Sequence, residues 1–241
     1  MTISSKEVIL ENKLILNTDC YVQEGCKKYD NNLCTEQFCI RLYKIDELYN
    51  KALLTKEQRI PLRLRLDNNR IDEVPYTKLK SYQKNIIEFV NNGTNLYIFS
   101  NTTGNGKTSW AIKLLQAYVN KIWASSDLTC RVLFINVPNF MRELKLNISQ
   151  KSDYIKHIND NVLNADIVVW DDIATKGTSE FEHEQLISII DSRMNDKKSN
   201  IFTSNITPQD LPNMLGARLA SRIIGLSECI PFNGYDKRGV S

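Results

Sequence analysis

A short glycine-containing loop, "SNTTGNGKTSW" (residues 100–110), has residue types that can hold a chain of phosphates. It follows the apolar run "NLYIF" and precedes a stretch with helical apolar spacing. Backbone N–H groups at the start of a helix attract anions, and glycines let the backbone wrap closely around them. Lys107 is placed to bridge the terminal phosphates, and Thr108 is placed to ligate magnesium. The loop therefore predicts a site for ATP and Mg²⁺.

The predicted nucleotide contacts are the consecutive residues Asn101, Thr102, Thr103, Gly104, Asn105, Gly106, Lys107, Thr108 and Ser109. Asn101 stands where this Walker A pattern usually has glycine. Asparagine tolerates left-handed backbone angles better than most residues, so we expect the loop to keep its fold. The alternative is a chance glycine turn before a surface lysine.

Two carboxylates end a second apolar run, "ADIVVWDDI". In a parallel sheet they would lie at the carboxyl edge, where ligands bind. We expect Asp171 to hold the magnesium ion and Asp172 to orient the attacking water, as catalytic residue. Asp172 is one methylene shorter than the usual glutamate, which predicts slow hydrolysis. The alternative for such a pair is a helix cap or a solvated turn.

These residues must be positioned by alternating strands and helices. Five short runs rich in β-branched and aromatic residues predict strands, and apolar residues at helical spacing lie between them. This alternation predicts an open α/β fold with a parallel sheet covered on both faces. The pattern begins near residue 76, which divides the chain into residues 1–75 and 76–241. The strand runs are "NLYIF", "RVLFIN", "DIVVW", "NIFTSN" and "SECIPF".

Polar and basic side chains late in the chain are further candidates. Asn205 ends the run "NIFTSN", where its amide could reach the terminal phosphate or the attacking water. Arg218 and Arg222 lie four apart on one helix face, and Arg238 follows near the end. These arginines are either solvated partners of carboxylates or an arginine finger that completes a neighbouring subunit's site.

The chain resembles the DnaC/DnaI-type replicative helicase loaders of the AAA+ ATPase superfamily. The likeness rests on "TTGNGKTSW", on "LNADIVVWDDI" with the segment up to "NIFTSN", on "GARLASRI" and on "FNGYDKR". It implies a five-stranded parallel sheet flanked by helices. It also implies that Asn205 is a sensor, that Arg222 is the finger of the pair with Arg218, and that Arg238 is a late sensor. Arg193 matches an arginine at the end of the helix after the acidic strand.

The resemblance implies a function carried out by assembly. Such loaders bind the hexameric replicative helicase and place it on single-stranded DNA, with ATP governing release, and they self-associate through the finger. Part of the DNA contact comes from the region matched by residues 137–164. Its basic residues could contact DNA, and a solvated amphipathic face explains them equally well. These residues are Arg142, Lys145, Lys151 and Lys156.

Four clustered cysteines favour a metal site in the amino-terminal segment: Cys20, Cys26, Cys34 and Cys39. Four thiolates suit tetrahedral zinc, and an iron–sulfur cluster or free thiols are the alternatives. A small Cys-rich domain of this kind binds the helicase in the resembling family. Apolar residues after the cluster are candidates for that contact or for packing against the metal module. They are Leu42, Ile45, Leu48 and Tyr49.

Composition restricts the remaining classes only mildly. The net charge of +3 and the pI of about 8.4 do not by themselves predict nucleic-acid binding. No apolar run approaches the roughly 20 residues that span a bilayer, so we expect a cytoplasmic protein without membrane contact. Other AAA+ DNA-dependent ATPases of the transposition-regulator type, and P-loop kinases, are the alternative functions. Residue usage rich in Asn, Lys and Ile makes a phage origin plausible.

Overall fold

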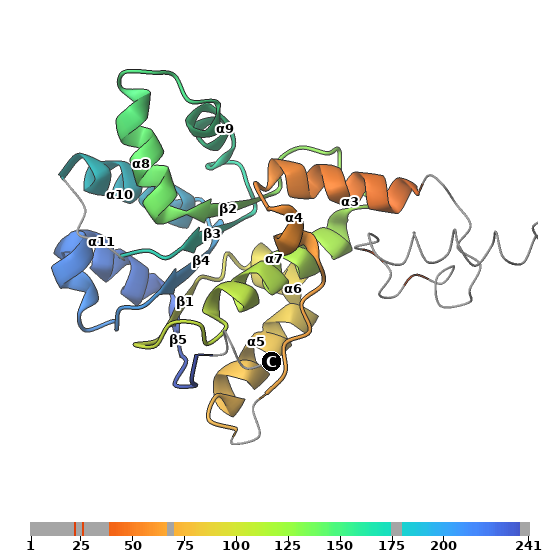
Figure 1. The fold of residues 1–241 in the computed structure, drawn as a ribbon, viewed down its shortest axis with the longest axis horizontal. Helices are drawn as coiled ribbons and strands as arrows, with labels where there is room; N and C mark the ends of the chain where they lie inside the picture. Colours follow the sequence, from red (N-terminus) through yellow and green to blue (C-terminus); the bar gives the residue numbers. More distant parts are fainter. Residues whose placement is uncertain (1–21, 23–25, 27–38, 67–69, 175–179, 237–241) are drawn as a thin grey trace, which may run out of the picture.

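The structure, a computed structural model, describes residues 22, 26, 39–66, 70–174 and 180–236. A parallel five-stranded sheet forms its centre, with strand order β2-β3-β4-β1-β5 (Figure 1). All five strands coincide with the apolar runs of the sequence, which confirms the predicted sheet. The strands are β1 (Leu96–Phe99), β2 (Val132–Asn136), β3 (Ile167–Asp171), β4 (Ser199–Ser204) and β5 (Glu228–Pro231).

The strands are buried on both faces, so their sequences read as continuous apolar runs. Ile98 of β1 and Val169 of β3 point to one hydrophobic core, whereas Tyr97 and Val168 point to the other. Successive side chains of a strand alternate between faces, so each run supplies both cores.

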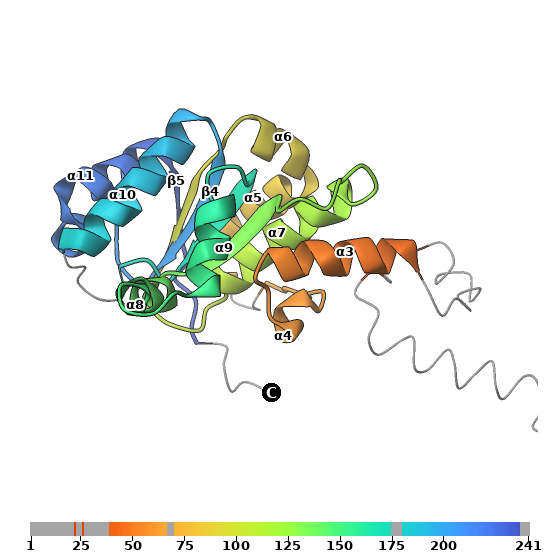
Figure 2. The same ribbon diagram turned by 90° about the horizontal axis from the view of Figure 1, so that it is seen from above.

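Helices on the first face bury apolar side chains against Ile98, Val169 and their neighbours. The principal one is α7, which begins directly after the glycine loop and contacts β2, β3 and β4. Figure 2 shows α5, α6 and α7 on the same side of the sheet. The elements of this layer are α3 (Ile40–Lys51), α4 (Lys56–Arg59), α5 (Glu73–Lys84), α6 (Ile86–Asn91) and α7 (Lys107–Ile122).

Helices on the second face cover Tyr97, Val168 and Trp170. α10 and α11 pack against each other, and α8 packs on β2. The sheet between the two helical layers matches the predicted α/β architecture. The elements of this layer are α8 (Val137–Asn147), α9 (Asp153–Asn161), α10 (Glu180–Asn195) and α11 (Leu211–Leu226).

Helix α3 is part of the first helical layer. Ile45, Leu48 and Tyr49 are at most 1% exposed and pack in the same core as α7 and β2. The backbone N–H of Phe134 in β2 donates to the carbonyl of Ala52, at 2.9 Å, so the end of α3 covers the edge of the sheet. Burial in this core contradicts a direct helicase contact through Ile45, Leu48 and Tyr49. Packing against a metal module stays a prediction, because Val22, between Cys20 and Cys26, lies in the same core.

The division of the chain at residue 75 stays a prediction. Residues 40–66, on its amino-terminal side, contribute to the core described above, with Leu42, Leu62 and Leu64 partly buried against it. Among the helices that the structure describes, none has the length and apolarity needed to cross a membrane.

Candidate functional site

The glycine loop joins the end of β1 to the start of α7, as the sequence predicts. Gly104 and Gly106 have φ of 70° and 101°, which favours glycine at both positions. Asn105 is buried and its Nδ2 donates to the Ser100 hydroxyl at 2.5 Å and to the Thr102 hydroxyl at 3.2 Å. Its side chain therefore closes the loop on itself.

Asn101 does not need the left-handed conformation that we expected it to tolerate. Among the described residues of the loop, only the two glycines have positive φ. Asparagine is compatible with the loop at position 101 because φ is not positive there, so the position does not require glycine.

Lys107 lies in the concavity of the loop and is only 6% exposed. Its ammonium group donates to the carbonyl of Thr102 at 2.8 Å and to Oδ1 of Asn105 at 3.1 Å. These contacts hold the charge beside the helix N-terminus, where the helix dipole also favours an anion.

The acidic strand meets the loop at the carboxyl edge of the sheet. Thr108 Oγ1 donates to Asp171 Oδ1 at 2.7 Å, and Thr203 Oγ1 of β4 donates to the same oxygen at 2.8 Å. Asn136, at the end of β2, lies opposite Asp171 in the strand register, and its Nδ2 is 3.5 Å from Oδ2. A hydroxyl and a carboxylate side by side are the hard oxygen ligands that Mg²⁺ prefers.

The pKa of Asp171 is raised from its ordinary value. Burial is the largest cause, and the charge of Asp172 adds to it, whereas the hydrogen bonds from Thr108, Thr203 and Asn136 act in the opposite direction. A carboxylate held in this way gains from a nearby cation, which would lower its pKa.

Asp172 follows β3 in a strained turn. Its φ is 56°, and Ala174 has φ of 68°, angles that few side chains other than Asn and Asp adopt readily. The turn is held by β4, since the Asp172 N–H donates to Thr203 Oγ1 at 3.0 Å and the Ser204 hydroxyl donates to the Ile173 carbonyl at 2.7 Å. Backbone strain of this kind is concentrated at functional sites.

The segment after β5 contacts the glycine loop. Thr102 Oγ1 donates to the Gly234 carbonyl at 3.0 Å, and the buried Asp72 carboxylate accepts from the N–H groups of Asn233 and Gly234 at 2.7 and 3.1 Å. The late "FNGYD" segment therefore lies beside the predicted phosphate site. Arg238, the predicted late sensor, lies outside the described residues.

The two arginines of α11 contact a carboxylate of their own chain. Arg222 Nε is 3.2 Å from Asp191 Oδ1, and Arg218 is 3.5 Å from Asp191 Oδ2. Both arginine side chains are exposed, at 47% for Arg222 and 74% for Arg218. Asn205, the predicted sensor, is half-buried directly after β4.

Arg193 is a structural residue. It is fully buried, and its guanidinium donates four hydrogen bonds, to Asn200 Oδ1 and to the carbonyls of Val162, Ala165 and Ser199, at 2.5–2.8 Å. Burial lowers its pKa to about 9, so the group stays protonated at neutral pH. It joins the end of α10 to the loop before β3 and to the start of β4.

The basic residues of the α8–α9 region are exposed. Lys145 forms an ion pair with Glu182 at 3.1 Å, and Arg142 donates to Asn139 at 2.7 Å, whereas Lys151 and Lys156 face solvent. Neither of their two interpretations is decided by this geometry.

The cysteine cluster is only partly within the described residues. Cys26 and Cys39 are described as free thiols, and Cys20 and Cys34 lie outside the described ranges. Among described residues there is no group of three or more potential metal ligands of the His, Cys, Asp and Glu types.

Two contributors to the site were missed by sequence reasoning. Asn136 ends the strand beside β3, and Thr203 lies in the predicted strand "NIFTSN". Because adjacent parallel strands align their carboxyl ends, the last polar residue of each predicted strand was the available signal.

Replicative helicase loader DnaC of Escherichia coli K12 is 25% identical over 138 residues, covering 57% of this chain and 54% of the relative. DnaC of Buchnera aphidicola (Schizaphis graminum) is 25% identical, covering 65% and 61%, and DnaI of Bacillus subtilis is 24% identical, covering 66% and 51%. The chain thus spans about half to three fifths of these relatives.

Solved structures share the fold. The DnaC helicase loader superposes with a TM-score of 0.55 at 23% identity, covering 70% of this chain and 94% of that chain. AMPPCP-bound DnaA from Aquifex aeolicus gives a TM-score of 0.50 at 19% identity, covering 73% and 51%. The family of the bacterial DnaA ATPase domain matches residues 78–227, more than half of the chain. The chain therefore belongs to the bacterial DnaA ATPase domain family.

Proposed function

We propose that this chain loads the replicative hexameric DNA helicase onto single-stranded DNA in an ATP-dependent step. The observation that carries the proposal is the contact between Thr108 and Asp171, because it joins the phosphate loop to the acidic strand in one site. Support for the loader role comes from the curated relatives, which are named replicative helicase loaders.

The site residues suit ATP with Mg²⁺. The N–H groups of residues 101–109 would surround the phosphates, Lys107 would contact the terminal ones, and Thr108 and Asp171 would hold the cation. Magnesium supplies charge neutralisation on the phosphate oxygens. The neighbouring oxygens of Thr108 and Asp171 fit such an ion in donor type.

In hydrolysis, Asp172 would orient the attacking water and Asn205 would contact the water or the terminal phosphate. Asp172 is shorter than glutamate and is held in the strained turn after β3, which supports slow turnover by the isolated protein. A steady-state ATP hydrolysis rate of about 10 s⁻¹ or more by the isolated protein, which is a typical enzyme turnover, would contradict this part of the proposal.

Arg222 would act as an arginine finger in a neighbouring copy of the chain. It is exposed at the surface of α11, and its contact with Asp191 would hold it in place until that copy docks. Self-association of this kind would make hydrolysis depend on assembly.

The predicted zinc site and the predicted role of residues 1–75 in helicase binding remain part of the proposal. Metal analysis of the full chain tests the first, with one zinc per chain expected. Iron in place of zinc, or a metal content near zero, would contradict it.

The loader role is tested by capture of the replicative helicase from the same organism. We expect ATP-dependent capture by the full chain, loss of the ATP effect in the Lys107→Ala variant, and delivery of the helicase to a single-stranded circle. Autonomous DNA-stimulated hydrolysis with no helicase capture would instead support the transposition-regulator type of ATPase.

A further inference from the structure

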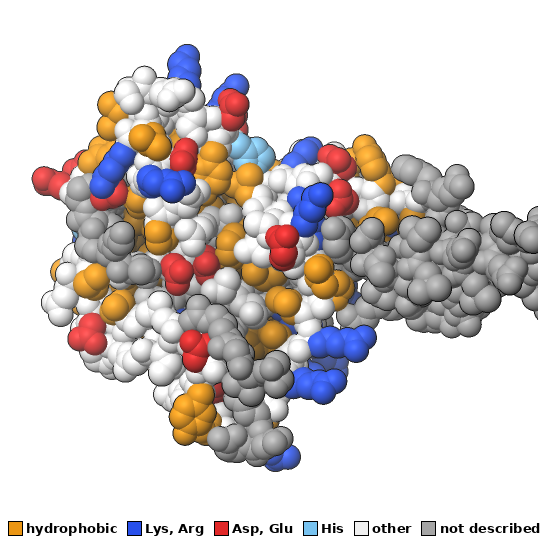
Figure 3. Space-filling model, in the orientation of Figure 1, with side chains coloured by type: hydrophobic (Ala, Val, Ile, Leu, Met, Phe, Trp, Pro, Cys, Tyr) orange, Lys and Arg blue, Asp and Glu red, His pale blue; other side chains and the backbone are white. Residues whose placement is uncertain are grey.

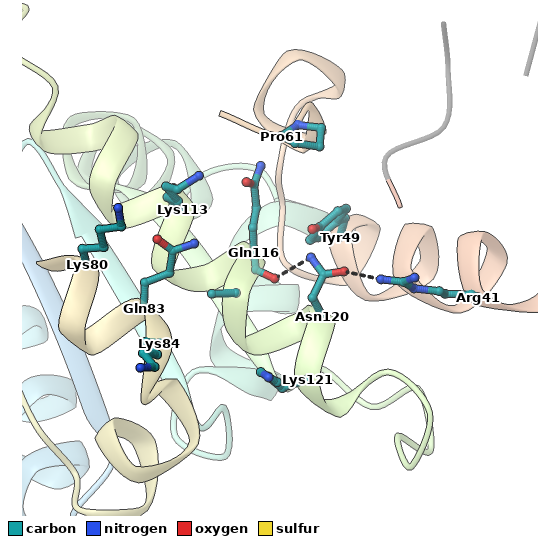
Figure 4. A pocket seen from close by; sticks show the side chains of 11 residues that line it. Arg41, Tyr49, Pro61, Lys80, Gln83, Lys84, Lys113, Gln116, Asn120 and Lys121 are labelled. Carbon is teal, nitrogen blue, oxygen red and sulfur yellow. Dashed lines mark hydrogen bonds between the residues drawn. The ribbon is translucent and has the colours of Figure 1, made fainter. Parts of the chain in front are cut away.

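A basic hollow of about 570 Å³ lies between α3, α5 and α7 (Figure 4). Figure 3 shows basic side chains gathered on the lower right of the drawn face, beside α5. Among the described residues that line the hollow, none is acidic. The basic residues that line it are Arg41, Lys80, Lys84, Lys113 and Lys121.

The wall of the hollow is held by hydrogen bonds within the chain. Gln116 Nε2 donates to the carbonyls of Gln58 and Ile60 at 2.8 and 3.1 Å, and Asn120 Nδ2 donates to the Gln116 carbonyl at 2.9 Å. Asn120 in turn accepts from Arg41 at 3.4 Å, as Figure 4 shows. The amides are fixed before any ligand arrives, which lowers the entropy cost of binding.

Arg41 offers an additional donor at this wall. Its Nε is buried and has no hydrogen-bond partner in the part of the chain that the structure describes. Its guanidinium carbon lies 5.8 Å from the centroid of the Trp123 ring, which orients the planar group. Because buried donors are nearly always hydrogen-bonded, an oxyanion at the wall would supply the partner that this nitrogen lacks.

A second hollow of about 470 Å³ continues the first, because Lys84 and Lys121 line both. It extends along α6 and contains one carboxylate, Glu88. Lys80 and Lys84 are one helical turn apart, about 6 Å along the axis, and Lys113 and Lys121 are about 12 Å apart along theirs. The cations therefore form two rows that suit a chain of phosphates better than a single compact anion.

We propose that these two hollows form a groove that binds the phosphodiester backbone of a single-stranded nucleic acid. Grooves of this kind track the backbone by charge. The groove is distinct from the ATP loop and from the basic residues of α8 and α9, and it goes beyond the proposed function because it does not require the helicase.

The test is binding of a fluorescent oligothymidylate to the full chain over a range of salt concentrations. We expect the double variant Lys84→Gln/Lys121→Gln to bind about tenfold more weakly at 0.1 M salt. The slope of log K against log salt should also flatten by about 1.4, since each phosphate contact on a single strand contributes about 0.7. The matched comparison is Lys151→Gln/Lys156→Gln, which removes two exposed lysines, one just before α9 and one in it.

Unchanged affinity and slope in Lys84→Gln/Lys121→Gln, whether or not Lys151→Gln/Lys156→Gln has an effect, would overturn the proposal. Thermal melting and Mg·ATP binding of each variant check that the fold is intact. Weaker oligothymidylate binding by Lys84→Gln/Lys121→Gln supports the groove even if the chain does not capture the helicase. The groove and the helicase-loading function can therefore fail independently.

A small polyphosphate is the alternative ligand of this groove, because it carries the same kind of phosphate charge as a nucleic-acid backbone. The Lys107→Ala variant, which lacks the loop lysine, is titrated with ATP and with inorganic tripolyphosphate. Suppose that Lys107→Ala still binds ATP or tripolyphosphate, and that adding Lys84→Gln and Lys121→Gln abolishes this binding without changing the affinity for oligothymidylate. That result would assign the groove to small polyphosphates and contradict the binding of a nucleic-acid strand.

Discussion

At the scale of single residues, Asp171 decides how the site responds to magnesium and to pH. Its raised pKa means that the folded protein holds the carboxyl proton more tightly than the unfolded chain does. The corresponding stability is full below the unfolded value of 3.8 and is lost as the pH rises through the folded pKa. The ionised group therefore costs stability at neutral pH.

Asp171→Asn should keep or raise the melting temperature at pH 7, because the neutral amide oxygen still accepts from Thr108 and Thr203. The same variant should bind Mg·ATP at least about tenfold more weakly, a change of about 1.4 kcal/mol. Melting curves and calorimetric titrations measure both. A destabilised fold with unaltered magnesium dependence would contradict the assigned role.

Proton linkage gives a second expectation at this residue. Binding of the cation favours the carboxylate, so Mg·ATP affinity of the native chain should fall as the pH is lowered toward the raised pKa of Asp171. Affinity measured between pH 7 and pH 5 in the presence and absence of Mg²⁺ separates this from effects on the nucleotide alone. In Asp171→Asn the pH dependence should be weaker.

Arg193 is expected to act on stability and not on nucleotide chemistry. Arg193→Ala removes four buried hydrogen bonds, three of them to backbone carbonyls, which should lower the free energy of unfolding by about 3 kcal/mol or more. Urea unfolding measures it, with the exposed Arg142→Ala as control, expected within about 0.5 kcal/mol. Equal effects of the two variants would contradict the structural role.

At the scale of elements, the loop depends on two glycines and not on position 101. Asn101→Gly should change ATP affinity by less than about twofold. Gly106→Ala should weaken it more, because φ of 101° is strained for alanine even though no atom would contact the added Cβ. Equilibrium titration with a fluorescent ATP analogue distinguishes them, and the reverse order of effects would refute the loop geometry.

Helix α3 should contribute to the stability of the ATPase core. Leu48→Ala removes a side chain that is 1% exposed and should cost about 2–5 kcal/mol of unfolding free energy. Leu146→Ala, at a position 53% exposed, is the matched control and should cost little. A negligible effect at Leu48 would show that α3 does not pack on this core in solution.

The strands and the phosphate loop could be predicted because their signals are local. Each strand is a continuous apolar run, and Gly104, Gly106 and Lys107 have a fixed spacing before a helix. The packing of α3 against the sheet could not be predicted, because Ile45, Leu48 and Tyr49 give the same helical pattern whichever surface buries them. The partnership of Asp191 with Arg218 and Arg222 depends on two helices that meet only in the fold.

At the scale of the whole molecule, the finger proposal predicts complementation between copies. Arg222→Ala and Lys107→Ala should each lack assembly-dependent ATPase activity, and mixing them should restore part of it, because mixed assemblies place an intact Arg222 beside an intact loop. Asp191→Asn should not lower the activity of such assemblies. ATPase activity of Arg222→Ala assemblies equal to that of the unaltered chain would contradict the arginine-finger role of Arg222.

The central claim is that one molecule of Mg·ATP binds between the glycine loop and the acidic turn after β3. Isothermal titration of the full chain with Mg·ATP tests it most directly, with Lys107→Ala as the comparison. The account predicts saturable binding of one nucleotide per chain that the substitution abolishes. Absence of binding, or binding that Lys107→Ala leaves unchanged, would contradict it.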